Sequence, residues 1–358
     1  MSSQRRSLSG RQRGLSLVEL MVAMTLGLIL LAGLTQIFVS NKQAFLLSQA
    51  QATVQESGRE AAMLIGRDVR SADYWGCLTR NSSIASNLNP SSADSLLNFD
   101  QGLHIVEDTD GHNDVIDGSH VITLRGIDPS AAVMVAEMPA ANAAALHLAD
   151  ASSIRPGDLL LVSDCESANL FQATNVNTNV VVHNTGNRFA PGNASQIMPR
   201  NYANNARVLR PSVLRYSVQA KAGGERSLML ERPALQGNGG DAESNVQSME
   251  MVRGVRDLRT LIGVDDDGDG AIDTWQDPPA ADASDAADIL DRTLAVRISV
   301  LARSVDDGVV EAPVTVCFPG WLDCDSAANG LVTAQDRALY RVYTFVASLR
   351  NRTLEQTP

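Results

Sequence analysis

Five aspartates within one short segment, residues 265–273, are the side chains of this sequence best suited to binding a metal ion. Asp265, Asp267 and Asp269 alternate at every second position, and Gly270 follows the third. In a curled loop this spacing turns oxygen atoms toward one point, and Ca²⁺ prefers oxygen ligands. The pattern predicts two further ligands, the backbone carbonyl of Ala271 and the carboxylate of Asp273.

The segment resembles an EF-hand loop but lacks its last ligand. An EF-hand carries a bidentate glutamate at the twelfth loop position. Here that position is Gln276, and Asp277 comes one residue late. A calcium site of modest affinity and a solvated acidic turn both fit the sequence. Without a cation, the clustered carboxylates would repel one another.

A single carboxylate at the mouth of an apolar run is the second feature with chemical meaning. After Glu19 no charged residue occurs before Lys42. Twenty apolar residues in a helix rise about 30 Å, enough to cross the hydrocarbon of a bilayer. A carboxylate drawn to mid-bilayer costs about 2.5–3.5 kcal/mol, so the position of Glu19 suggests a partner of opposite charge.

The charges before the apolar run predict its orientation. Four arginines precede it, which favours a single inner-membrane pass with the N-terminus cytoplasmic and the remainder exported. These are Arg5, Arg6, Arg11 and Arg13. A cleaved secretory signal would have a shorter apolar core, and a plain signal anchor would leave Glu19 unexplained.

Composition argues against nucleic acid as a partner and supplies no sign of catalysis. The net charge is −12, and losing the leader arginines would leave 25 basic residues against 41 acidic ones. Such a surface repels nucleic acid. The five histidines are scattered, and the sequence contains no nucleophile elbow, Walker loop or zinc-protease spacing. We therefore expect a protein that is not an enzyme.

The four cysteines all fall on the exported side, where disulfides persist. Four cysteines allow three pairings. Cys317 and Cys324 enclose a short loop with a Pro-Gly turn, which favours that pair, and Cys77 would then pair with Cys165. Free buried thiols are the alternative.

Hydrophobic periodicity predicts one long helix followed by many strands. Residues 15–72 read as a helix that crosses the membrane at about 18–40 and then becomes amphipathic. Beyond residue 100 the pattern is short and typical of strands. The expected strands are 121–125, the end of 154–163, 180–183, a hairpin of 213–218 with 227–231, 294–300 and 338–347.

The N-terminus, Gly14-Leu15-Ser-Leu-Val-Glu19-Leu-Met, resembles the signal of type IV pilins and type II secretion pseudopilins. The resemblance implies that a prepilin peptidase cuts between Gly14 and Leu15 and methylates the new amine of Leu15. It also implies that Glu19 pairs with the terminal amine of a neighbouring subunit. The family usually has phenylalanine after the cut, where this sequence has leucine.

The body of the chain resembles minor pilins of the PilW type. The similarity lies in residues 71–77, 161–166, 171–174, 252–258 and 263–270, and in the closing strand 343–351. It implies an α+β, pilin-like fold: a long N-terminal helix packed on an antiparallel β-sheet, with an enlarged β-rich head. The expected divisions are a leader at 1–14, a helix at 15–72 and a head at 73–358, with an inserted subdomain at about 126–205.

The resemblance implies a role in assembly. We expect a minor pilin that helps to initiate a type IV pilus at or near its tip. The implied partners are other minor pilins, the major pilin, prepilin peptidase and a tip adhesin, with membrane lipid around the helix before assembly. The alternatives are a GspJ-like pseudopilin of type II secretion and a calcium-dependent adhesin head.

Overall fold

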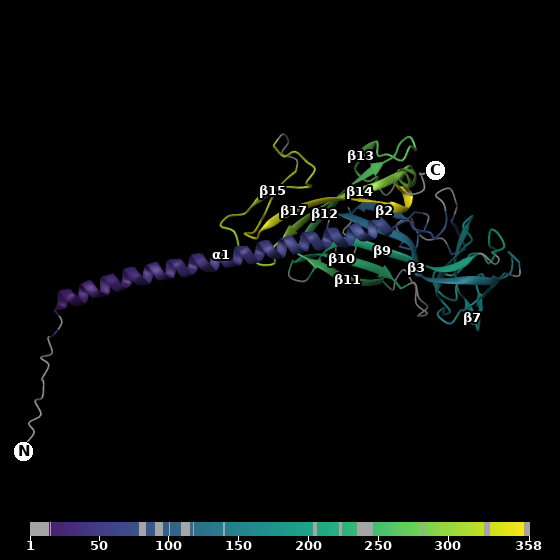
Figure 1. Ribbon diagram of the computed structural model, residues 1–358, viewed down its shortest axis with the longest axis horizontal. Coiled ribbons are helices and arrows are strands. Elements are labelled where there is room, and N and C mark those ends of the chain that lie inside the picture. The colour runs from purple at the N-terminus through teal and green to yellow at the C-terminus, as the bar shows by residue number, and fades with distance from the viewer. Residues whose placement is uncertain are drawn as a thin grey trace, which may run out of the picture.

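The computed structural model describes residues 14, 16–78, 84–89, 96–99, 101–108, 115–116, 118–138, 140–202, 206–221, 224–234, 246–280, 283–325 and 330–353. It contains one long helix and a β-rich head (Figure 1), so the fold is α+β, as the sequence predicts. The elements are α1 (Leu17–Ser71), β1 (Ile84–Ser86), β2 (Leu103–Glu107), β3 (His120–Glu137), β4 (Ala145–Leu148), β5 (Leu159–Ser163), β6 (Ala168–Gln172), β7 (Asn175–Asn177), β8 (Val180–Val182), β9 (Arg207–Ala220), β10 (Arg226–Pro233), β11 (Val246–Arg253), β12 (Val255–Val264), β13 (Thr274–Gln276), α2 (Ala286–Asp291), β14 (Thr293–Arg303), β15 (Thr315–Cys317), β16 (Leu331–Thr333), β17 (Tyr340–Ser348) and α3 (Arg350–Thr353).

The long helix stands clear of the head along its N-terminal half and is docked on it along its C-terminal half (Figure 1). Its 55 residues correspond to a length of about 80 Å. The docked face carries small and branched apolar side chains at helical spacing. Those that are buried are Ala50, Val54, Ala61, Ile65 and Val69.

The docked face begins later than the sequence pattern indicates. Ala44 and Leu47 belong to the same predicted stripe, but Ala44 is exposed and Leu47 is only half-buried. Periodicity shows which face of a helix is apolar, and the reach of the head decides how much of that face is covered.

A glycine in the docked half allows strand β17 to approach the helix closely. A Cβ atom on Gly58 would lie 2.2 Å from the ring of Tyr343. At Gly66 the space is larger, because a Cβ atom there would lie 3.6 Å from the ring of Phe345, an ordinary contact. Glycine lowers helix propensity, so its presence at position 58 is explained by this contact.

The head contains two main sheets. The larger has eleven strands in the order β1-β6-β5-β9-β3-β4-β8-β7. Off this path, β10 pairs with β9, β11 pairs with β10, and β2 pairs with β3. The smaller has the order β13-β12-β14-β17. Neighbours in both sheets are antiparallel except for β1 and β6. The predicted hairpin is present as β9 and β10, in which Tyr216 lies opposite Leu230.

The main hydrophobic core lies where the two sheets meet the docked half of α1. It combines Ile65 and Val69 of the helix with residues of both sheets, such as Ile122 and Ile298. Polar side chains also join the sheets. The imidazole Nδ1 of His120 accepts hydrogen bonds from the backbone N–H of Thr260 at 3.1 Å and from its hydroxyl at 2.7 Å.

Residues 133–208 build a second core at the far end of the head. It contains Phe171 and Tyr202, among others, and is separate from the core beneath the helix. The strands β3 and β9 belong to both regions, because they pair from Ile122 opposite Tyr216 to Met134 opposite Arg207. The region expected at 126–205 as an inserted subdomain is thus joined to the rest of the head through β3 and its partner β9, and the insertion itself stays a prediction.

Candidate functional site

The first turn of α1 places Glu19 at the N-terminal end of the helix. Ser16 is the N-cap: its hydroxyl accepts the backbone N–H of Glu19 at 3.2 Å. Its carbonyl accepts the N–H of Leu20 at 3.1 Å. Glu19 is exposed, and the helix macrodipole favours a carboxylate there by about 0.3–1 kcal/mol. Gly14 is also exposed, while Leu15 lies outside the described residues.

The serine cap is a feature that the pilin resemblance did not predict, although the sequence contains its signal. Serine followed three residues later by glutamate is the pattern of a capping box. Ser16 and Glu19 mark the helix start in that pattern, and the structure shows its serine half, the hydroxyl of Ser16 with the backbone N–H of Glu19.

The N-terminal half of α1 is an apolar surface without cover from the rest of the described chain. Before Ala50 no described residue of the helix is buried. The helix is long and apolar enough to cross a membrane, with a mean hydropathy of 2.3 over its most apolar 18 residues. Its exposed residues include Leu28, Ile29, Leu30, Leu34 and Phe38.

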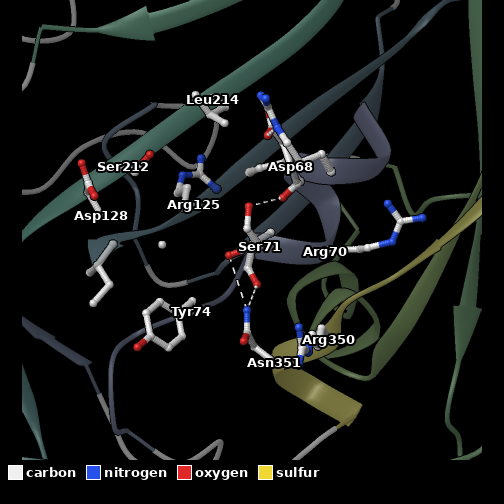
Figure 2. Close-up of a pocket in the computed structure, with 15 residues that line it drawn as sticks. Asp68, Arg70, Ser71, Tyr74, Arg125, Asp128, Ser212, Leu214, Arg350 and Asn351 are labelled. Carbon is white, nitrogen blue, oxygen red and sulfur yellow. Dashed lines mark hydrogen bonds and ion pairs between the residues drawn. The ribbon is translucent and has the colours of Figure 1, made fainter. Parts of the chain in front are cut away.

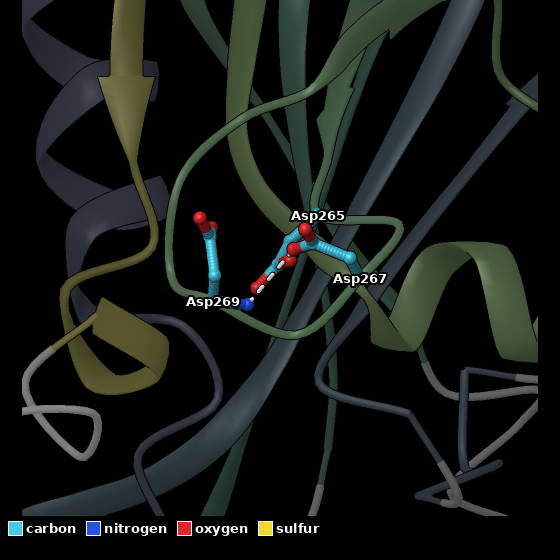
Figure 3. A group of neighbouring side chains, drawn as sticks. All are labelled: Asp265, Asp267 and Asp269. Carbon is cyan, nitrogen blue, oxygen red and sulfur yellow. Dashed lines mark hydrogen bonds between the residues drawn. The ribbon is translucent and has the colours of Figure 1, made fainter.

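The acidic loop connects β12 to β13 and brings three predicted ligands together (Figure 3). One carboxylate oxygen from each of Asp265, Asp267 and Asp269 lies within 4.8 Å of the others. Asp265 is buried and accepts backbone N–H groups from Gly268 at 2.7 Å and Gly270 at 3.0 Å. Both glycines have positive φ, 82° and 87°, which explains why glycine occupies these turns.

The other predicted ligands lie on the same loop but make different contacts. The carboxylate of Asp273 accepts the backbone N–H of Asp266 at 2.7 Å. The backbone N–H of Ala271 donates to Asp269 at 2.8 Å. The side chain of Asp266 makes a 2.8 Å ion pair with Arg292, which removes one carboxylate from the cluster. The loop returns as a strand, and Gln276 lies opposite Ile262 in the sheet.

Both expected disulfides are present. Cys77 and Cys165 link the segment after α1 to the end of β5, with their Cα atoms 4.7 Å apart. Cys317 and Cys324 close the short loop that follows β15, with their Cα atoms 5.8 Å apart. The described chain has no free cysteine. The first disulfide therefore fixes the segment after α1 to the large sheet, and the second closes the loop after β15.

Two buried histidines have a lower pKa than an ordinary imidazole. Burial, with a smaller effect of nearby Arg259, lowers the pKa of His120 to about 4. Burial also lowers the pKa of His183 to about 4. His183 is fully buried against the ring of Phe171, and neither ring nitrogen has a hydrogen-bond partner among the described residues. Both side chains therefore remain neutral in the folded protein near pH 7.

Comparison with known proteins yields two family matches. Residues 215–351 match the family described as type IV pilus-assembly protein W. Residues 9–35 match the prokaryotic N-terminal methylation motif. No curated protein and no solved structure matches the chain. The first match covers β10 to β17, which include β14 and β17 beside the docked half of α1. The second match runs from the segment before α1 to Thr35, within the apolar half.

Proposed function

We propose that this chain, which matches the type IV pilus-assembly protein W family and the prokaryotic N-terminal methylation motif, is a minor pilin that helps to initiate assembly of the pilus at or near the tip. The observation that carries this proposal is the position of Glu19 in the first turn of a helix whose apolar half has no partner in the described chain. We infer that other molecules must cover the exposed apolar surface of this helix and pair with Glu19. The family is structural, and we propose no catalytic activity.

The pairing of Glu19 follows from the electrostatics of the helix start. After cleavage between Gly14 and Leu15, only Leu15 would precede the N-cap Ser16. The new ammonium group would then lie at the positive end of the helix dipole, which disfavours it, while Glu19 is favoured there. A neighbouring subunit shifted along the filament supplies the carboxylate that this ammonium group needs and offers its own ammonium group to Glu19.

The place of assembly follows from the anchor and the size of the head. The methylation motif and the apolar helix fit a pilin anchored in the inner membrane. We propose that the N-terminus is cytoplasmic and the head periplasmic before extraction into the surface filament. A head with two cores fits poorly into a repeating shaft and suits an end position. The proposed partners are prepilin peptidase, other minor pilins, the major pilin and a tip adhesin.

The test of the assembly role is the variant Glu19→Val. It should lower the number of surface pili about tenfold or more, because removing one partner of a charge pair in an apolar setting leaves the other uncompensated. Glu60→Val is the control, since it removes the same charge from an exposed position in the docked half of α1. Normal piliation by Glu19→Val would refute the role of Glu19.

A deletion strain separates a pilus component from a secretion component. Loss of twitching motility with normal protein secretion supports the pilus assignment. The opposite result would make the chain a pseudopilin of type II secretion. The acidic loop motivates a third candidate, a calcium-dependent adhesin head, which glycan binding by the full chain would favour.

We also propose that the acidic loop binds Ca²⁺ through Asp265, Asp267 and Asp269, with Ala271 and Asp273 as further ligands. Three converging carboxylates and no nitrogen or sulfur donor suit a hard cation. Titration calorimetry with about 5 mM calcium should show binding that Asp267→Ala and Asp269→Ala remove. Asp288→Ala is the control, because Asp288 is an exposed carboxylate outside the loop that pairs with Arg292. No heat from the unaltered protein would refute the site.

A further inference from the structure

An open groove of about 690 Å³ lies where α1 ends against the large sheet (Figure 2). The paired residues Gly126 of β3 and Ser212 of β9 form part of its lining. The end of α1 contributes Arg67 and Arg70, and α3 contributes Arg350. The groove lies where both strands continue beyond the last turn of the helix, and two of its lining residues, Gly126 and Ser212, are small.

The charge of this groove is opposite to that of the chain. Four arginines and two aspartates line it, whereas the whole chain carries a net charge of −12. One of the four, Arg125, is buried and already donates to two backbone carbonyl groups. One of the aspartates, Asp68, already accepts a hydrogen bond from Arg67 at 2.7 Å and one from the hydroxyl of Tyr216 at 2.6 Å. The arginine side chain of that pair remains 64% exposed, so its outer edge is open to a ligand.

The negative end of the helix dipole does not cancel this positive charge, because donors cap the last carbonyl groups. Arg70 donates to the carbonyl of Gly66 at 2.9 Å. The side-chain amide of Asn351 donates to the carbonyls of Ser71 at 3.4 Å and Ala72 at 2.8 Å. An anion entering the groove would therefore meet guanidinium groups rather than bare carbonyl oxygens.

Lipid headgroups are not the source of that anion. Arg67 follows Asn41, the end of the apolar run, by 26 residues, and a helix of that length rises about 39 Å. The groove thus lies well beyond the headgroups of a bilayer that the apolar run would cross. Clusters of arginine bind acidic peptide motifs through paired N–H donors that match a carboxylate.

We propose that this groove binds an acidic peptide segment of a neighbouring pilus subunit. The proposal deepens the assembly role and rests on it for the identity of the partner. The hollow strand surface accommodates the peptide, and Arg67 and Arg70, one helical turn apart, bind its carboxylates. The remainder of the acidic head repels the same segment, which restricts binding to the groove.

The test measures binding of fluorescein-labelled hexaglutamate to the full-length processed protein in a non-ionic detergent. Binding should be detectable below about 1 mM peptide and should weaken with added salt. Hexalysine should not bind at the groove. The double variant Arg67→Gln with Arg70→Gln should weaken hexaglutamate binding about tenfold. The control Arg253→Gln with Arg341→Gln removes the same charge from β11 and β17 and should leave binding unchanged.

A second variant tests peptide binding to the groove without changing any charge. Ser212→Phe retains every arginine but fills the groove, and should weaken binding as strongly as the double arginine variant, with an unchanged melting temperature. Equal loss in the control variant, or no binding by the unaltered protein, would overturn the proposal. Because the binding measurement requires no filament, a negative result would not contradict the assembly role. Conversely, the result of the Glu19→Val piliation assay would not decide whether the groove binds peptide.

Discussion

Both halves of α1 carry apolar side chains, but those side chains have opposite surroundings. Before Ala50 no described residue of the helix is buried, whereas beyond it Val54, Ala61 and Ile65 are completely buried against the sheets. The docked half completes the core of its own head. We propose that lipid, and then other subunits, cover the bare half, the part of α1 before Ala50. On this proposal one helix divides its apolar surface between folding and assembly, and substitutions in the two halves should have different effects.

The largest difference should come from truncating a matched pair of isoleucines. Ile65→Ala removes a fully buried side chain and should lower the free energy of unfolding by about 2–5 kcal/mol. Ile37→Ala changes a side chain that is 59% exposed and should leave unfolding of the head unchanged. Urea denaturation followed by tryptophan fluorescence in detergent measures both. Equal effects would show that the two halves are not energetically distinct.

Acid should weaken the head that holds the docked half. The pKa values of His120 and His183 lie near 4 in the folded state, below the unfolded value near 6.5. The unfolded chain therefore binds protons first, so stability is complete above about pH 6.5 and declines toward pH 4. Melting temperatures across this range measure the decline.

The variant His183→Leu tests whether buried histidines cause the predicted loss of stability in acid. It removes one of the two titrating groups and also two ring nitrogens without a described partner, whose burial costs about 1–3 kcal/mol. It should raise the melting temperature at pH 7 and reduce the loss at acid pH. The exposed N-terminal half of α1 contains no histidine, so we expect no histidine-dependent change there as the pH falls. A steeper decline in His183→Leu would contradict this account.

A smaller contrast should come from two glycines. Gly58→Ala places a methyl group against the ring of Tyr343 and should destabilise the head by about 1–3 kcal/mol. The same change at Gly33 meets no atom within 4 Å and should stabilise the helix by up to about 1 kcal/mol. Thermal unfolding followed by circular dichroism compares the two. A neutral Gly58→Ala would mean that the helix and β17 separate easily.

Local sequence patterns predicted the features that depend on local spacing. The helix expected at 15–72 is observed at Leu17–Ser71, and the aspartates at alternate positions do converge. Strand β6 was missed because all five of its residues are buried and two are polar, which removes the alternation. Its polar side chains find partners far away in sequence, such as Asn87 for Asn169. The groove was equally hidden, since it combines α1, β3, β9 and α3.

We propose that the bare half of α1, with Glu19 at its start, is an assembly element exposed by processing. Mass spectrometry of the protein purified from sheared surface pili is the decisive test. We expect a mature chain that begins at Leu15 with a methylated amine. A chain that begins at Met1, keeps its leader arginines and occurs only in the membrane fraction would contradict it.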